Sequence, residues 1–214
     1  MNTIKNEDII TALNWRYAVK TFDATKKVSD EDFTTIIESA RLAPSSVGIE
    51  PWKFIVVKNP EIRAKLREAG YDQTKITDAS HLVVVAQRTD VINLPDELIA
   101  RTSKITGKSA DELTGLKGMA EGSFDKRSAE EIDMWLKTQT FIPLGMMIET
   151  AALLGIDAGP MEGFDPEKVN EILGLPEKNL KVSTMIAFGY RGDDKYAEIP
   201  KTRRDFSDAV EIIE

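Results

Sequence analysis

The segment APSSVGIEPWKFIVV, residues 43–57, contains a helix end, a polar loop and a strand in one short stretch. Pro44 predicts the end of a preceding helix, because the residue before a proline avoids the helical region. Two adjacent hydroxyls and Gly48 then form a turn-like polar loop. From Trp52 onward, apolar and β-branched residues predict a strand. This stretch therefore predicts a helix followed by a strand, joined by a loop rich in hydrogen-bonding groups.

Helices and strands also alternate on both sides of this segment. Before it, Ser29 and Asp32 form a capping-box pattern at the start of an apolar helical repeat. After it, Asn59-Pro60 opens a short helix, with proline at the first helical position, where it is tolerated. Residues 82–86 and 182–188 are the other predicted strands. Because no two strands are joined by a two-residue hairpin turn, the pattern favours an α/β or α+β fold with excess helix.

The longest helical pattern begins at a capping box, Ser128-Ala-Glu-Glu131. Pro143 interrupts it and is expected to kink or split the helix, and Gly155 is a natural end. Residues 155–164, which contain glycines and a proline, are interpreted as a loop after this helix. At the other end of the chain, Asn6 is expected to cap the first helix.

Composition limits the class of protein. The 214 residues, 42% of them hydrophobic and 30% charged, suit one globular domain over residues 1–214. The net charge of −8 would repel nucleic acid and anionic membranes, so neither is an expected partner. The N-terminal residues do not resemble a secretory signal, and no apolar run reaches the length of a membrane span. We therefore expect a cytoplasmic protein.

Residue usage excludes several kinds of catalysis. The chain has no cysteine, so disulfides, thiolate nucleophiles and cysteine metal sites are impossible. Its one histidine, His81, cannot build a zinc site of imidazoles and is expected to be a packing or capping residue before a strand. Neither a G-x-G-x-x-G turn after a strand nor a phosphate-binding P-loop motif is present. Any NAD(P)H must therefore bind without the usual glycine turn.

Four segments could carry chemistry, and each also has an ordinary structural explanation. Arg16 to Lys20 could clamp a phosphate or a flavin, or could be solvated cations at a helix end. The hydroxyls of residues 45–46 could bind a phosphate or ribityl chain, or could belong to an ordinary turn. Residues 155–164 allow a backbone to approach a flat ligand, but also resemble a common loop. The basic residues of 199–204 could be no more than a solvated patch.

Taken in order, these segments resemble the nitroreductase family of FMN enzymes, and within it the oxygen-insensitive NAD(P)H nitroreductase and dihydropteridine reductase branch. The resemblance covers nearly the whole chain, from Arg16 to Arg203. The stretches that carry it are Arg16-Tyr-Ala-Val-Lys20 with Thr21-Phe22-Asp23, Ala43-Pro-Ser-Ser46 with Glu50-Pro51-Trp52, Lys75 with Asp78-Ala-Ser-His81, Gly159-Pro-Met-Glu-Gly-Phe-Asp165, and Pro200-Lys-Thr-Arg203.

The resemblance implies an α+β fold, in which a mostly antiparallel central sheet is flanked by helices. It also implies an intertwined homodimer with two FMN sites at the dimer interface, each lined by both chains. In the implied site, cations near both chain ends hold the phosphate, lysines lie at the N1/O2 edge of the ring, and the partner chain supplies residues 44–46. The residues implied to bind FMN are Arg16, Tyr17, Ala18, Lys20, Pro44, Ser45, Ser46, Gly48, Asp72, Gln73, Lys75, Pro160, Met161, Glu162, Gly163, Lys201 and Arg203.

The implied activity is transfer of a hydride from NAD(P)H through flavin N5 to a small electron-poor acceptor, with ping-pong kinetics. The acceptor would be a nitroaromatic, quinone, pteridine or flavin, in a pocket shaped by residues 102–128. No side chain acts as acid or base in this scheme; Lys20 and Glu162 tune the ring. An NAD(P)H-flavin reductase, a non-catalytic flavin-binding dimer and an acidic protein-interaction domain remain as alternatives.

Several positions depart from the family pattern. Tyr17-Ala18 stands where His-Ser is common, so one hydroxyl contact is missing. Gly48 and Glu50 replace an asparagine and a glutamine, and Asp72 replaces a ring-facing asparagine. These changes bear on acceptor preference and ring contacts more than on FMN binding itself.

Overall fold

The computed structural model describes residues 3–214. Its strands are β1 (Trp52–Val56), β2 (His81–Arg88), β3 (Asp157–Met161) and β4 (Leu180–Gly189). Its helices are α1 (Asn6–Trp15), α2 (Asp30–Arg41), α3 (Pro60–Ala69), α4 (Lys75–Asp78), α5 (Leu94–Thr106), α6 (Thr114–Gly122), α7 (Ala129–Leu153), α8 (Pro166–Leu173) and α9 (Phe206–Ala209).

The four strands form one sheet in the order β1-β2-β4-β3, and every neighbouring pair is antiparallel. The central strands β2 and β4 are almost wholly buried, which explains the continuous apolar run at residues 82–86 of β2. The register between them shifts at Val85/Ala86, where one strand is bulged. The α+β class and the antiparallel sheet expected from the resemblance are confirmed.

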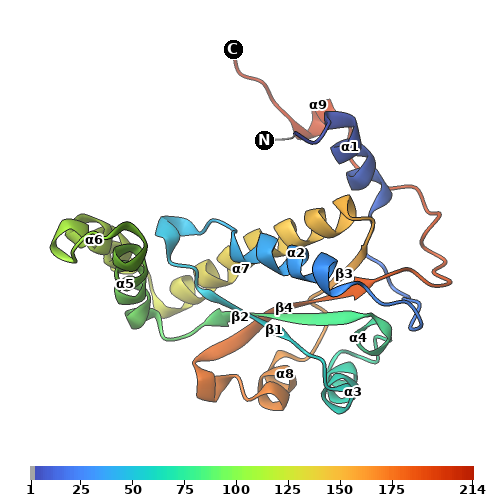
Figure 1. The fold of residues 1–214 in the computed structure, drawn as a ribbon, viewed down its shortest axis with the longest axis horizontal. Coiled ribbons are helices and arrows are strands. Elements are labelled where there is room, and N and C mark those ends of the chain that lie inside the picture. Colours follow the sequence, from blue (N-terminus) through green and yellow to red (C-terminus); the bar gives the residue numbers. More distant parts are fainter. Residues whose placement is uncertain (1–2) are drawn as a thin grey trace.

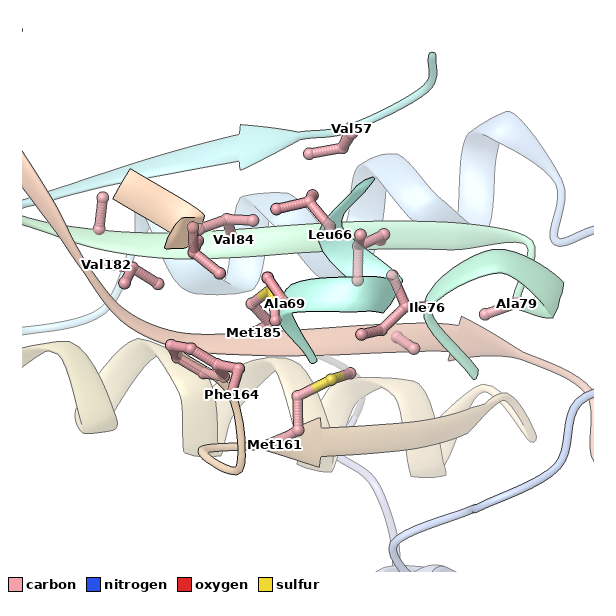
Figure 2. Packing of buried hydrophobic residues seen from close by; sticks show 14 of the residues in the cluster. Val57, Leu66, Ala69, Ile76, Ala79, Val84, Met161, Phe164, Val182 and Met185 are labelled. Carbon is pink, nitrogen blue, oxygen red and sulfur yellow. The ribbon is translucent and has the colours of Figure 1, made fainter. Parts of the chain in front are cut away.

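Helices cover both faces of the sheet (Figure 1). Because side chains alternate along a strand, Val84 and Met185 face a cluster with α3 and α8, whereas Val83 and Ile186 face a second cluster with α2 and α7. Figure 2 shows the first cluster, in which residues from α3, α4 and the strands meet. Its labelled members are Val57, Leu66, Ala69, Ile76, Ala79, Val84, Met161, Phe164, Val182 and Met185.

The long helix α7 joins this sandwich to two outlying parts. Its N-terminal half holds α5 and α6 through a third cluster, in which Leu136 packs with Leu98 and Ala120. Helix α1 also packs on α7, yet none of its residues is buried. In Figure 1 α1 lies near the C-terminal arm, residues 203–214, which runs away from the sheet. Apolar side chains on both remain exposed: Ile10 by 57%, Phe206 by 74% and Ile213 by 88%.

Phe22 sits in a socket that only glycine can form. Its ring is buried against Gly159 on β3 and Gly189 on β4. A β-carbon at Gly189 would lie 2.8 Å from the ring, and one at Gly159 would lie 2.8 Å from the carbonyl oxygen of Val19. The socket therefore fixes the segment after α1 directly against the sheet.

Three details differ from the sequence prediction. Asn6 is the first residue of α1 rather than its cap, which is Lys5. Pro143 does not split α7, because buried residues on both sides of it, such as Leu136 and Met147, keep one continuous helix against the sheet and α2. Strand β3 lies in the segment interpreted as a loop; its Pro160 is accommodated because β3 is an edge strand, where a missing N–H is tolerated.

Candidate functional site

An extended segment, residues 16–20, follows α1 and runs beside β3. Arg16 ends the helix, and its N–H still donates to the Ala12 carbonyl oxygen at 3.0 Å. Ala18 forms a parallel bridge with Ala158, and the N–H of Val19 donates to the Ala158 carbonyl oxygen at 3.1 Å. The backbone that carries Arg16 and Lys20 is therefore fixed to the edge of the sheet, and these residues do not belong to a frayed helix end.

Two lysines, the exposed Lys20 and the buried Lys75, carry positive charge near this edge. Lys75, the first residue of α4, is only 3% exposed, and its ammonium group donates one long hydrogen bond, 3.4 Å, to the Pro160 carbonyl oxygen. Burial, and then the charge of nearby Lys20, lower the pKa of Lys75 from its usual 10.5 to about 8. Within residues 3–214, neither lysine forms an ion pair with a carboxylate. The two lysines therefore form a positively charged site that has no anionic partner among the described residues.

A second group of cations joins the two ends of the chain. The ammonium group of Lys201 donates to the Leu13 carbonyl oxygen at the end of α1. Burial, followed by the positive charges of Arg16 and Arg203, lowers the pKa of Lys201. The three predicted phosphate ligands are thus close enough to interact, although they come from positions nearly 190 residues apart in the chain. Such a cluster suits a multiply charged anion.

The turn after β3 supplies the remaining wall. A hollow of about 310 Å³ lies between α7 and β3, lined by Phe141, Leu144, Ile148, Pro160, Met161, Glu162 and Thr184. The Glu162 carboxylate pairs with Lys137 of α7 at 3.3 Å. Gln73 donates from its side chain to the carbonyl oxygens of Gly163, at 2.7 Å, and Gly70, at 2.9 Å. These contacts fix the loop that was predicted to line a ring.

Asp72 lies beside this loop, in a left-handed backbone conformation with φ of 58°. Its carboxylate accepts a hydrogen bond from Arg67 at 2.6 Å and is otherwise largely exposed. A direct role for Asp72 toward a ligand stays a prediction.

The serine loop is held by other elements. The N–H of Ser46 donates to the Gln139 side chain of α7 at 2.8 Å, and Ser45 Oγ accepts from the N–H of Glu50 at 2.8 Å. Arg101 of α5 donates to the Gly48 carbonyl oxygen at 2.7 Å, and Gly48 needs its left-handed φ of 75°. The serine loop is therefore held to α7 through Ser46 and to α5 through Gly48, and the approach of Pro44, Ser45 and Ser46 to a ligand remains a prediction.

Sequence reasoning did not identify three charged residues beside the site, Asp157, Arg191 and Asp194. Arg191 and Asp157 form a bidentate pair, with Nη2 to Oδ1 at 2.6 Å. Asp194 accepts hydrogen bonds from the backbone of residues 20–21. The partners lie far apart in the chain, so no local motif could have revealed them. His81, by contrast, stacks on Phe33 with ring centroids 3.8 Å apart, as the packing role expected for it requires.

Over residues 3–214, no group of three or more histidine, aspartate or glutamate side chains is placed to hold a metal ion. None of the helices drawn in Figure 1 is both long enough and apolar enough to cross a membrane.

Comparison with known proteins identifies the family. The model of the nitroreductase family matches residues 13–190. The chain belongs to the nitroreductase family. A Bacillus subtilis relative of this family, “Putative NAD(P)H nitroreductase YfkO”, is 40% identical over 96% of this chain and 97% of its own length. A Staphylococcus epidermidis protein, also named “Putative NAD(P)H nitroreductase”, is 39% identical over 98% of both chains. The resemblance drawn from the sequence is thereby confirmed.

Solved structures share the nitroreductase fold over nearly the whole chain. A “putative nitroreductase in complex with FMN” from Exiguobacterium sibiricum matches with a TM-score of 0.81 at 20% identity, covering 100% of this chain and 99% of its own. A “putative nitroreductase” from Bacillus subtilis matches with a TM-score of 0.85 at 20% identity, covering 98% of this chain and 100% of its own. At these identities the likeness concerns the fold.

Proposed function

We propose that this chain is an FMN-dependent NAD(P)H oxidoreductase of the nitroreductase type. The family membership and the names of the relatives support the class of reaction. A fold neighbour that holds FMN supports the cofactor. The observation that carries the proposal is the buried ammonium group of Lys75 beside Lys20, because this pair has no anion of its own among the described residues.

The residues present fit FMN. A pKa of about 8 for Lys75, against 10.5 when exposed, means that keeping it charged in the fold costs roughly 3 kcal/mol below pH 8. An anionic ligand edge would relieve this cost. Reduced flavin concentrates negative charge at N1 and O2, which is the charge that Lys20 and Lys75 would stabilise in a site screened from water. FMN, when bound, supplies the two-electron chemistry between NAD(P)H and the acceptor.

The chain's own residues divide the remaining work. Arg16, Lys201 and Arg203 would hold the phosphate, since their charges already converge in the structure. Segment 160–163 would line the ring, fixed by the Gln73 and Lys137 contacts described above. A backbone N–H of Glu162 or Gly163 would face N5. This arrangement assigns binding, orientation and electrostatics to the protein and asks no side chain to transfer a proton.

We also propose a homodimer. Helix α1 and the C-terminal arm expose apolar side chains that a single chain leaves uncovered, including Leu13 at 37%, Phe206 at 74% and Ile212 at 75%. Exposed apolar surface of this kind is typical of an interface. Pro44, Ser45 and Ser46 would then reach the site of the other protomer, in a loop that contacts α7 through Ser46 and α5 through Gly48 in this chain.

The acceptor is proposed to be a small electron-poor compound, such as a nitroaromatic, quinone, pteridine or flavin, in the cytoplasm. The part of the chain expected to shape the acceptor pocket, residues 102–128, forms the end of α5, all of α6 and the turns around them. Reduction of free flavin is the closest alternative activity, and a flavin-binding dimer without turnover is another.

An absorbance spectrum of the purified protein, followed by anaerobic addition of NADH or NADPH, tests the proposal. A flavin spectrum that bleaches with either nucleotide is the expected result. A protein that binds FMN but is not bleached would favour the non-catalytic dimer. A protein that remains colourless and fails to take up added FMN would refute the proposal. Sedimentation of the same sample reports the oligomeric state.

A further inference from the structure

Arg191 is stacked between two aromatic rings on the segment that precedes the lysine pair. Its guanidinium lies 4.4 Å from the ring centre of Trp15 and 4.7 Å from that of Tyr17. Stacking of this kind on two rings holds both side chains in one orientation. Arg191 thus contacts the residues immediately before and after Arg16, Trp15 and Tyr17.

The other side of the guanidinium is anchored to the sheet. Asp157, the first residue of β3, accepts from Arg191 Nε at 3.0 Å and Nη2 at 2.6 Å, and also from its backbone N–H at 2.7 Å. The Asp157 side chain is only 4% exposed, and a bidentate pair has a fixed geometry. Since β3 leads directly to Pro160 and the ring-lining turn, Arg191 links the two walls of the proposed site.

Asp194 holds the far end of the same segment. Its carboxylate accepts from the N–H groups of Lys20 at 2.7 Å, Thr21 at 3.2 Å and Tyr196 at 3.0 Å. It is 7% exposed. Burial would raise the pKa of Asp194, but these backbone donors outweigh burial and lower it, so the carboxylate stays charged. Burial and the neighbouring Asp194 charge raise the pKa of the Tyr17 hydroxyl, which stays neutral.

The two anchors together decide which way the cations face. Side chains alternate along an extended segment. Tyr17 is turned to Arg191 and Val19 is fully buried in the core, so Arg16, Ala18 and Lys20 lie on the opposite side. This arrangement agrees with the electrostatics, because the charge of Arg16 lowers the pKa of Lys201 and the charge of Lys20 lowers the pKa of Lys75.

We infer that Arg191 and Asp194 are positioning residues for the FMN site. Arg191 orients Arg16 toward the phosphate, and Asp194 orients Lys20 toward the ring edge. This inference rests on the proposed function and adds to it the residues that orient the two cations. It also explains Tyr17, which departs from the common family pattern: here its ring serves as a stacking partner for Arg191 rather than as a ligand contact.

The experiment compares FMN with riboflavin, which lacks the phosphate. Apoprotein is titrated with each flavin and the quenching of flavin fluorescence gives Kd. Arg191→Met is expected to raise Kd for FMN by 10-fold or more while changing Kd for riboflavin by less than threefold. In Asp194→Asn, the amide side chain cannot accept hydrogen bonds from all three backbone N–H groups. This variant is expected to raise both Kd values by similar factors, because FMN and riboflavin share the same ring edge.

Arg88→Met is the matched control. Arg88 is as buried as Arg191 and pairs with two carboxylates, Asp90 and Glu97, at 2.6 and 2.7 Å, but lies outside the site. It is expected to lower the melting temperature without changing either Kd. If Arg191→Met does not fold by circular dichroism, Arg191→Lys replaces it, with a smaller loss confined to FMN.

The outcomes separate the two claims. Wild-type apoprotein that binds neither flavin overturns the proposed function and the positioning roles with it. Wild-type apoprotein that binds FMN, with folded Arg191 and Asp194 variants binding it equally well, overturns only the positioning roles. If Arg191→Met weakens FMN and riboflavin alike, the role of Arg191 in orienting Arg16 is overturned. If Arg88→Met weakens FMN as strongly as the two site variants do, both positioning roles are overturned, because the loss would then reflect general destabilisation.

Discussion

Two buried cations lie on the α3–α4 side of the sheet, and their surroundings are opposite. Arg63 donates to three backbone carbonyls of residues 76–80, two of them at 2.6 and 2.7 Å. Lys75 has one long contact, to Pro160, and a like charge, Lys20, nearby. The donors of Arg63 are used by the fold, whereas the ammonium group of Lys75 has only this one long contact among the described residues. We therefore expect a buried charge to indicate a binding site only where the fold leaves some of its hydrogen-bond donors without partners.

Replacing Arg63 by methionine should have the largest effect. Three carbonyls would lose their donor, and each unsatisfied buried group costs about 1–3 kcal/mol. We expect the free energy of unfolding, measured with urea, to fall by about 3 kcal/mol or more. Lys65→Met, on the same helix but exposed, should change it by less than about 0.5 kcal/mol. If the free energy of unfolding of Arg63→Met falls by less than about 1 kcal/mol, the proposed contrast between Arg63 and Lys75 is wrong.

Replacing Lys75 by methionine should separate affinity from stability. A hydrogen bond to a charged group contributes about 1.5–3 kcal/mol, so we expect Kd for FMN to rise by roughly 10- to 100-fold. The apoprotein should be no less stable in urea, because the buried charge is removed with its cost. Lys53→Met, at an exposed position of β1, serves as the control. An unchanged Kd together with a large loss of stability would show that Lys75 is structural, like Arg63.

The smallest expected effect is the uptake of a proton when FMN binds. The pKa of Lys75 is about 8 because of burial and the Lys20 charge, so about half of the side chains are neutral at pH 8. Binding of an anion favours the charged form and should therefore take up about half a proton per site at pH 8, falling toward zero below pH 7. Calorimetric titration with FMN in two buffers of different ionisation enthalpy measures this uptake. If the Lys75→Met variant takes up the same amount of proton when FMN binds, the proton belongs to another group.

Local patterns predicted most of the fold. The capping boxes at Ser29 and Ser128 begin α2 and α7 as expected, and the strands predicted at residues 82–86 and 182–188 lie within the buried strands β2 and β4. Strand β3 was missed because its sequence, Asp157 to Met161, contains a glycine and a proline and becomes a strand only by pairing with β4. Propensity is weak where tertiary pairing decides.

The site was predictable in part, and for a different reason. The ordered motifs brought Arg16, Lys75 and Lys201 to attention because a family resemblance connects residues that are distant in the sequence. Arg191 and Asp194 escaped, since their partners are defined by stacking and by backbone N–H groups that no pattern of side chains encodes. Contacts of this kind become visible only when the folded chain is known.

The glycine socket around Phe22 bears on how this protein can diverge. A methyl group at Gly159 would meet the Val19 carbonyl oxygen at 2.8 Å, and relief of that clash would push the neighbouring Lys20 outward from the edge of β3. A single added carbon would thus alter the electrostatics of the proposed site without replacing any charged residue. We therefore expect new substrate preferences to arise more readily by mutation in the α5–α6 region, which is proposed to shape the acceptor pocket, than along residues 16–20, where the backbone itself sets the position of the charge.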